Sequence, residues 1–414
     1  MIPRGRLAAL AAAALALMAL VAGATAAAGG PRAEKLRLPA DLGRPSEVIA
    51  YGESKLLLVD PYADAGLIRI DNDGFLDPSF GEGGRLATSY NGITVAPDGK
   101  LLVPYFHDGD AAVTRLMPDG TPDPSFGEGG LATLDFGGIY DGASTVAVAP
   151  DGDIIVGGAM QRSPSSRGIS DAVPAIGRLL PDGTVDRSFG NGGKRILEGG
   201  WEGGVADVKP LRGGGIVAAG EGFLGIAVWK LTANGRMNRN FGKHGVLNLE
   251  GRGRREEYGW EEELDWVEEV APLPSGKLLL AATGSNYDGR KTRYRAVALR
   301  LKANGKVDRS FGRRGWATTN FGGTTFVHDL AVLPRGILVV FANAQFHHDK
   351  ESDLGAVAFN RRGGIYRGFG NGGKVRVNLH GWDLIDNGTI QAGRAVILGR
   401  DRGGEPWLVG VPNL

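Results

Sequence analysis

The sequence contains no cysteine among its 414 residues. It can therefore form no disulfide, no thiolate metal site and no cysteine nucleophile, and it lacks the cysteine that anchors a bacterial lipoprotein. An excess of one charge is also missing, because 47 Lys and Arg stand against 46 Asp and Glu, a formal net charge of +1. Domains that bind nucleic acid carry a clear basic excess, so we expect no nucleic-acid partner.

Long apolar runs are absent except near the start of the chain. Residues 1–28 carry Arg4 and Arg6, then an Ala/Leu-rich run over Leu7–Val21, then small residues at 24–26. This three-part pattern is typical of a cleaved export signal, and it predicts a secreted protein whose mature part spans residues 29–414. An uncleaved membrane anchor is the alternative, although the run is short for a span of about 20 apolar residues. We expect no other membrane contact.

Glycine is abundant, because 69 of the 414 residues are glycine and the average share is only about 7%. These glycines belong to an internal repeat and not to a collagen-like period. Six segments share a turn followed by a Phe-Gly pair, and successive Phe residues are 46 to 70 positions apart. The six segments read IDNDGFLDPSFGEGG at 70–84, MPDGTPDPSFGEGG at 117–130, LPDGTVDRSFGNGG at 180–193, TANGRMNRNFGKHG at 232–245, KANGKVDRSFGRRG at 302–315 and RRGGIYRGFGNGG at 361–373.

A second pattern, an apolar strand, a tight turn and another apolar strand, begins near residues 48, 93, 146, 208, 267, 330 and 389. Together the two patterns predict four antiparallel strands per unit, which is the blade of a β-propeller. Residues 34–39 resemble a fourth strand, and the last unit lacks one. We therefore predict a single all-β domain of seven blades, closed by the N-terminal strand, with six blades and an extended tail at 34–39 as the alternative.

The repeated xPDGxxDxSFGxGG segment resembles the delta-60 repeat family of bacterial propeller proteins. Two copies depart from it, one with Asn238 and Asn240 near its Phe and one with Gly363, Tyr366 and Gly368. The resemblance implies the fold alone, because the family name describes a repeat and no activity. From the residues themselves we expect the Asp-Gly and Asn-Gly pairs to form turns and each Phe to pack between neighbouring sheets.

In a propeller, the connections from second to third strand and from fourth strand to the next blade leave on one face. The four most variable loops of this chain, 161–172, 251–265, 285–294 and 343–354, all fall there, which predicts a binding face. Aromatic and arginine residues of this face are the candidates for ligand or partner contact, with packing between blades or a solvated loop as the alternative. They are Trp201, Tyr258, Trp260, Trp266, Phe326, Trp382, Arg254 and Arg255.

Five histidines fall on the same face near aspartates and could hold a metal, although a solvated surface explains them more simply. They are His107, His328, His347, His348 and His380. Calcium at Asp71 to Asp73 is a weaker alternative to an ordinary turn. No nucleophile elbow, HExxH, Walker loop or paired-carboxylate motif is present. We therefore predict a secreted, monomeric, cofactor-free binding or scaffold module for a protein or glycan. The alternative is a secreted hydrolase, lyase or oxidoreductase that uses carboxylates and histidines at the channel mouth.

Overall fold

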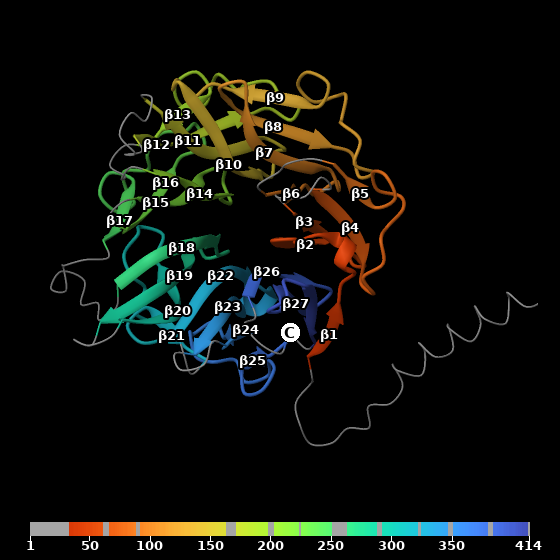
Figure 1. Ribbon diagram of the computed structural model, residues 1–414. Helices are drawn as coiled ribbons and strands as arrows, with labels where there is room; N and C mark the ends of the chain where they lie inside the picture. Colours follow the sequence, from red (N-terminus) through yellow and green to blue (C-terminus); the bar gives the residue numbers. More distant parts are fainter. Residues whose placement is uncertain are drawn as a thin grey trace, which may run out of the picture.

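The computed structural model describes residues 33–412 except 61–65, 88–91, 163–170, 198–202, 223–224, 251–262, 288–291, 322–323, 347–350 and 380–383. Seven four-stranded antiparallel sheets surround a central axis (Figure 1). The prediction of seven blades is confirmed, and the six-bladed alternative is wrong. Two three-residue 3₁₀ turns, η1 (Ala40–Leu42) and η2 (Pro334–Gly336), are the helical elements of the described part. No helix in that part is long and apolar enough to cross a membrane.

Blades 1 to 4 follow the chain, and each runs outward from its first strand. Blade 1 contains β2 (Glu47–Tyr51), β3 (Lys55–Val59), β4 (Leu67–Asp71) and β5 (Arg85–Leu86). Blade 2 contains β6 (Thr94–Val95), β7 (Leu101–His107), β8 (Asp110–Leu116) and β9 (Leu131–Leu134). Blade 3 contains β10 (Tyr140–Val148), β11 (Ile154–Gln161), β12 (Ala172–Leu179) and β13 (Lys194–Ile196). Blade 4 contains β14 (Gly203–Pro210), β15 (Ile216–Gly222), β16 (Gly225–Leu231) and β17 (Val246–Glu250).

Blades 5 to 7 repeat the plan, and the last takes its outer strand from the start of the described chain. Blade 5 contains β18 (Glu263–Pro272), β19 (Leu278–Tyr287), β20 (Thr292–Leu301) and β21 (Trp316–Thr319). Blade 6 contains β22 (Thr324–Val332), β23 (Leu338–Phe346), β24 (Glu351–Phe359) and β25 (Lys374–Val377). Blade 7 contains β26 (Leu384–Gln391), β27 (Arg394–Arg400), β28 (Pro406–Val411) and β1 (Glu34–Arg37).

The ring closes through β1, which pairs antiparallel with β28 beside the C-terminus (Figure 1). Leu36 lies opposite Leu408, and the Leu38 N–H donates to the Pro406 carbonyl at 2.9 Å just beyond the strand. The edge of the last blade is thus paired, which removes a template for aggregation. The closure expected from residues 34–39 is therefore present.

The core lies between adjacent blades. All six Phe residues of the repeat are at most 1% exposed, and each packs on the next sheet, as Phe126 does against Val146 and Ile154. The predicted role of these residues is confirmed. In the repeat, the Gly of each Asp-Gly or Asn-Gly turn has positive φ, for example 90° at Gly120, a conformation that costs a residue with a Cβ more than it costs glycine.

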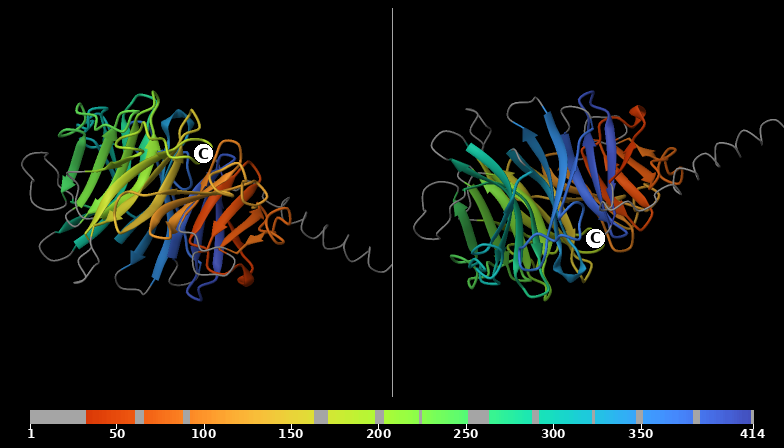
Figure 2. Two further views of the ribbon diagram at one scale, coloured as in Figure 1. Left: turned by 90° about the horizontal axis from the view of Figure 1, so that it is seen from above. Right: turned by 90° about the horizontal axis from the view of Figure 1, so that it is seen from below.

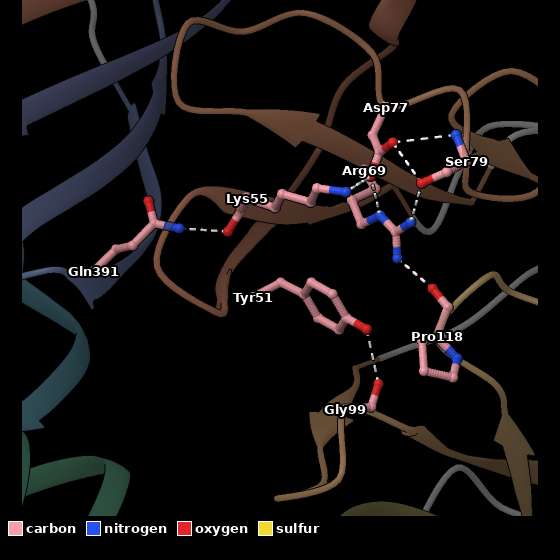
Figure 3. A network of polar contacts seen from close by, with 8 residues as sticks. All are labelled: Tyr51, Lys55, Arg69, Asp77, Ser79, Gly99, Pro118 and Gln391. Atoms are coloured by element: carbon pink, nitrogen blue, oxygen red, sulfur yellow. Dashed lines mark hydrogen bonds and ion pairs between the residues drawn. The ribbon is translucent and has the colours of Figure 1, made fainter.

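A buried ionic network joins each of several blades to the next (Figure 3). In blade 1, Arg69 Nε donates to Asp77 Oδ2 at 2.7 Å, Arg69 Nη2 donates to Ser79 Oγ at 3.0 Å, and Arg69 Nη1 donates to the Pro118 carbonyl of blade 2. Burial alone would raise the pKa of Asp77, but hydrogen bonds from Lys55, Ser79 and Arg69 outweigh burial and hold that pKa well below its usual range.

The same network recurs with the same spacing. Arg115 and Asp123, Arg178 and Asp186, and Arg300 and Asp308 repeat the pair eight residues apart, and each arginine reaches a backbone carbonyl of the following blade. Blade 4 carries Lys230 and Asn238 at these positions, and Lys230 reaches the Ala303 carbonyl at 3.0 Å. The Asp of the repeat therefore pairs with an arginine that bridges to the next blade, and it also accepts the hydrogen bonds of a local turn.

Candidate functional site

The strand order defines two faces of the ring, which Figure 2 shows from the side. On the loop face, second strands end and third strands begin, and each fourth strand leads into the next blade. The turn face carries the connections from first to second and from third to fourth strand. Because every blade is antiparallel with the same strand order, the flanking strand ends of all four predicted variable loops lie at the loop face. The central parts of those loops lie outside the described residues.

Exposed apolar side chains gather on the loop face between blades 2 and 3. Phe106, Ile139 and Tyr140 are 50%, 44% and 54% exposed, and the Phe106 and Tyr140 rings lie 6.1 Å apart between centroids at an interplanar angle of 55°. The Asp141 N–H donates to the Gly109 carbonyl at 2.8 Å, which holds the start of β10 against the β7–β8 hairpin. Backbone pairing thus places two tilted rings at the surface. We call these three residues the aromatic cluster.

Three carboxylates lie beside the aromatic cluster. Oxygens of Asp110, Asp135 and Asp141 come within 4.8 Å of one another. The Asp141 carboxylate is fully buried and accepts backbone N–H groups from Phe136 at 2.6 Å and from Gly137 at 3.0 Å. This loop already occupies Asp141, and Asp135 accepts the Gly137 N–H and lies 3.7 Å from Lys194 Nζ. Too few oxygens therefore remain for a hard cation that needs about six, namely those of Asp110 and the outer oxygen of Asp135. They can instead accept hydrogen bonds from a ligand.

The first, innermost strands of blades 3 to 7 each carry a β-bulge at the equivalent position of the strand. The pairing of first and second strands shifts at Ser144, Ala206, Glu268, His328 and Asp386 in blades 3 to 7. A bulge inserts one extra residue and redirects the side chains beside it. The residues that follow bond across blade boundaries: Asp207 Oδ2 accepts the Val270 N–H at 3.0 Å, and Asn387 Oδ1 accepts the Val48 N–H at 3.5 Å.

The bulges bring ionisable side chains from three consecutive blades close to one another. Lys209 Nζ lies 2.8 Å from Asp207 Oδ1 and 3.2 Å from Glu269 Oε1, and the carboxyl groups of Glu269 and Asp329 are hydrogen-bonded to each other. Glu47 of blade 1 acts electrostatically on Asp329. We call these five residues the axial cluster. Asp207, Lys209 and Glu269 keep 9%, 33% and 20% of their side-chain surface, so protein encloses the cluster while solvent still reaches it.

Burial sets the protonation of the axial cluster. It raises the pKa of Glu47 to about 7, and it raises the pKa of Glu269, to which repulsion by Asp329 and Asp207 adds. Burial also raises the pKa of Asp329, opposed by its hydrogen bond with Glu269 and reinforced by repulsion from Glu47. Burial would lower the pKa of Lys209, but Asp207 and Glu269 outweigh burial and raise it, so Lys209 stays charged. Two carboxyls joined by a hydrogen bond must hold one proton between them. The pair can therefore donate and accept a proton near neutral pH.

The described part of the chain tests few of the aromatic and arginine residues predicted to bind a ligand. Phe326 lies on β22, half-buried, with its ring 5.0 Å from that of Tyr294, so it packs against a neighbouring strand. Trp266 lies on β18 opposite Thr283 at a second bulge of that strand. Trp201, Tyr258, Trp260, Trp382, Arg254 and Arg255 lie outside the described residues.

Two of the five histidines predicted as metal ligands are described, and they lie in blades 2 and 6, which are not neighbours. His107 Nε2 is 3.6 Å from Asp108 Oδ2 at the surface, and burial lowers the pKa of His328, opposed by Asn343. No group of three possible metal ligands in the described residues contains a histidine. His347, His348 and His380 lie outside these residues, so the predicted histidine metal site stays a prediction.

Sequence reasoning missed the axial cluster, Phe106 and Ile139. Apart from Asp207 and Lys209, the cluster residues stand 60 or more positions apart along the chain, and no local motif joins them. A signal was nevertheless present, because a polar pair precedes the central apolar residue of several first strands, as Glu268-Glu269 and His328-Asp329 do. The sequence also shows an Arg followed eight residues later by an Asp in four repeats, from which the ion pair could have been predicted.

Comparison with known proteins bears on the fold. The family described as "Domain of unknown function (DUF5122) beta-propeller" matches residues 96–126 and 273–311. Each matched segment runs from the turn between first and second strand to the repeat Phe, in blades 2 and 5. No curated protein matches the sequence. The chain is thus a seven-bladed β-propeller with two repeats similar to this family, and its resemblance to delta-60 repeats stays a prediction.

Several solved structures are similar to this chain at low identity. The Nup133 β-propeller domain of Vanderwaltozyma polyspora is 10% identical with a TM-score of 0.42, over 94% of this chain and 99% of that one. A GH93 α-L-arabinofuranosidase of Fusarium graminearum is 10% identical with a TM-score of 0.42, over 78% and 91%. A protein of unknown function from Dyadobacter fermentans is 13% identical with a TM-score of 0.42, over 93% and 100%.

Proposed function

We propose that this protein is exported through its N-terminal signal and acts as a binding module for a carbohydrate on its loop face. The observation that carries the proposal is the aromatic cluster, where Phe106 and Tyr140 expose about half of their surface. Exposed rings of this kind offer apolar area to the C–H faces of sugars, and the neighbouring Asp110 and Asp135 can accept hydrogen bonds from hydroxyl groups. A scaffold for a protein partner is the competing use of the same surface.

The test is binding of the purified chain to a glycan array, followed by titration of the best ligand. We expect Tyr140→Ala and Phe106→Ala each to weaken binding about fivefold to tenfold, since losing one ring contact removes roughly 1 kcal/mol. Phe75→Ala is the matched control, because Phe75 is 62% exposed and lies on the turn face. Unchanged affinity in both loop-face variants would refute the proposal, and capture of a protein ligand without any glycan would replace the carbohydrate.

A second candidate function, acid–base catalysis in the channel, is favoured by the hydrogen bond between Glu269 and Asp329. A carboxyl pair that keeps a proton near neutral pH beside a charged lysine is suited to general acid and base roles. Screening the bound glycans for hydrolysis or elimination distinguishes the two functions. Turnover that disappears in Asp329→Asn while Tyr140-dependent binding persists would establish an enzyme, and binding without any turnover would leave the module non-catalytic.

A further inference from the structure

Charge is distributed unevenly around the turn face. The connection between third and fourth strands forms an equivalent 15-residue segment in six blades. In blades 1 and 2 (71–85 and 117–131) it holds seven acidic residues and one basic residue, and in blade 3 (180–194) two of each. In blades 4, 5 and 6 (232–246, 302–316 and 360–374) it holds twelve basic residues and one acidic residue. The near-neutral total of the chain therefore hides a basic arc, which we define as these last three segments.

Three arginines of the basic arc, one from each segment, are exposed and have no counterion in the described part of the chain. Arg239, Arg309 and Arg367 occupy the same repeat position, all are exposed, and none forms an ion pair or side-chain hydrogen bond with another described residue. The acidic residue of the arc, Asp308, is buried and already paired with Arg300 and Lys277. Through Arg239, Arg309 and Arg367 the arc therefore presents positive charge to solvent.

Two positions of the arc carry a basic side chain where the other blades use glycine. His244 and Arg314 have φ of 58° and 56°, and Gly83, Gly129, Gly192 and Gly372 stand at the equivalent position with φ of 63° to 66°. A left-handed conformation costs a residue with a Cβ roughly 1 to 2 kcal/mol. A Cβ at those four glycines would meet no atom within 4 Å, so the side chains of blades 4 and 5 project outward. The fold thus tolerates strain at two tips that display basic groups.

The three basic segments form one continuous rim that contains a hollow. The Gly242 N–H donates to the Asn304 carbonyl at 3.0 Å, and the Gly312 N–H donates to the Arg362 carbonyl at 2.7 Å, so each segment is bonded to the next. Between blades 5 and 6 a surface hollow of about 480 Å³ is lined by Arg313, Trp316, Asn360 and Arg362 among others. A lining that includes two guanidinium groups, an indole and an amide suits a ring that bears an acidic substituent.

From this arrangement we propose that the basic arc binds an anionic polysaccharide, a chain of sugars that bear carboxylate, sulfate or phosphate groups. The long rim matches a polymer, and the hollow accommodates one sugar ring. A membrane surface fits less well, because none of the exposed large apolar side chains lies in the three segments and interfacial anchoring needs such groups. A second copy of the chain fits less well too, since the acidic blades carry too few carboxylates to neutralise the arc.

The experiment measures binding of the full chain to polygalacturonate at low salt, with neutral dextran as the blank. The triple variant Arg239→Gln/Arg309→Gln/Arg367→Gln removes one cation from each basic segment, and Arg187→Gln removes the equivalent exposed residue from blade 3. We expect the triple variant to bind at least tenfold more weakly, with a shallower dependence on salt, and Arg187→Gln to stay within about twofold of the wild type. Exposed substitutions of this kind leave stability within about 0.5 kcal/mol.

Equal losses in the triple variant and in Arg187→Gln, or no loss in either, would overturn the proposal. Tighter binding to phosphatidylglycerol vesicles or to single-stranded DNA than to polygalacturonate would overturn the assignment to a glycan. A concentration-dependent dimer that the triple variant abolishes, without polygalacturonate binding, would assign the arc to self-association. Comparison with Tyr140→Ala distinguishes the two faces. Polygalacturonate binding that is lost in Tyr140→Ala and kept in the triple variant would place the polymer on the loop face and overturn the proposal for the basic arc.

Discussion

Replacing Asp123 by alanine tests whether the repeated Asp holds neighbouring blades together. Its side chain is 3% exposed and receives Arg115 Nε at 2.7 Å, Lys100 Nζ at 2.9 Å and Ser125 Oγ at 2.7 Å. Arg115 is itself 12% exposed, stacks 4.4 Å from the centre of the Phe126 ring and donates to a carbonyl of blade 3. Removing the carboxylate therefore leaves an enclosed guanidinium without its counterion.

Breaking a buried ion pair from one side costs about 3 to 5 kcal/mol. Lys100 is 24% exposed and can turn toward water when the carboxylate is removed. We therefore expect Asp123→Ala to lower the free energy of unfolding by about 3 kcal/mol, the lower end of this range. The chain supplies its own control in blade 4, where Asn238 replaces the Asp and accepts one N–H from Asn240 at 3.1 Å. Since no charge is lost there, Asn238→Ala should cost about 1 kcal/mol.

The assay is urea unfolding at pH 7 followed by tryptophan fluorescence, with free energies compared at a common slope. The pair Arg115→Met/Asp123→Leu should recover part of the loss, because apolar replacement of both partners leaves no uncompensated charge. The reasoning fails if Asp123→Ala and Asn238→Ala cost the same. It also fails if the double variant is less stable than Asp123→Ala alone.

Four further perturbations follow from the same structure. Burial raises the pKa of Glu47 from 4.5 to about 7. The contribution of Glu47 to stability is therefore complete below pH 4.5 and is lost as the pH rises through 7, by up to about 3 kcal/mol. Glu47→Gln should flatten this decline in thermal melts recorded between pH 4.5 and 8. Phe126→Ala should lower the free energy of unfolding by about 3 to 5 kcal/mol in urea titrations, and a loss below 1 kcal/mol would contradict its place in the core. Gly127→Ala should lower the free energy of unfolding far more than Gly129→Ala, which should cost about 1 kcal/mol. A Cβ at Gly127 would lie 1.9 Å from a backbone oxygen, whereas a Cβ at Gly129 would meet open space. Equal melting temperatures of the two variants would contradict this. Arg314→Gly should raise the melting temperature slightly while weakening polygalacturonate binding, and a lower melting temperature would show that the position is not strained.

Local chemistry explains why the repeat alone was enough to predict the propeller. A turn with positive φ at Gly120, an apolar run such as β7 and a plug such as Phe126 each depend on residues within a few positions. The last unit lacks a fourth strand, and the residues near Leu36 form a strand without a blade of their own. An unpaired sheet edge promotes aggregation, so these two strands were expected to pair, as β1 and β28 do.

Only the closed ring decided where the ionisable groups meet. Lys209, Glu269 and Asp329 come from three blades and belong together because each first strand bulges at the same height beside the axis. The basic arc is equally invisible in a chain of net charge +1, until backbone bonds such as Gly312 to Arg362 join the turns along one rim. Local sequence thus specifies each blade, whereas charge and protonation depend on distances across the ring, which no single repeat contains.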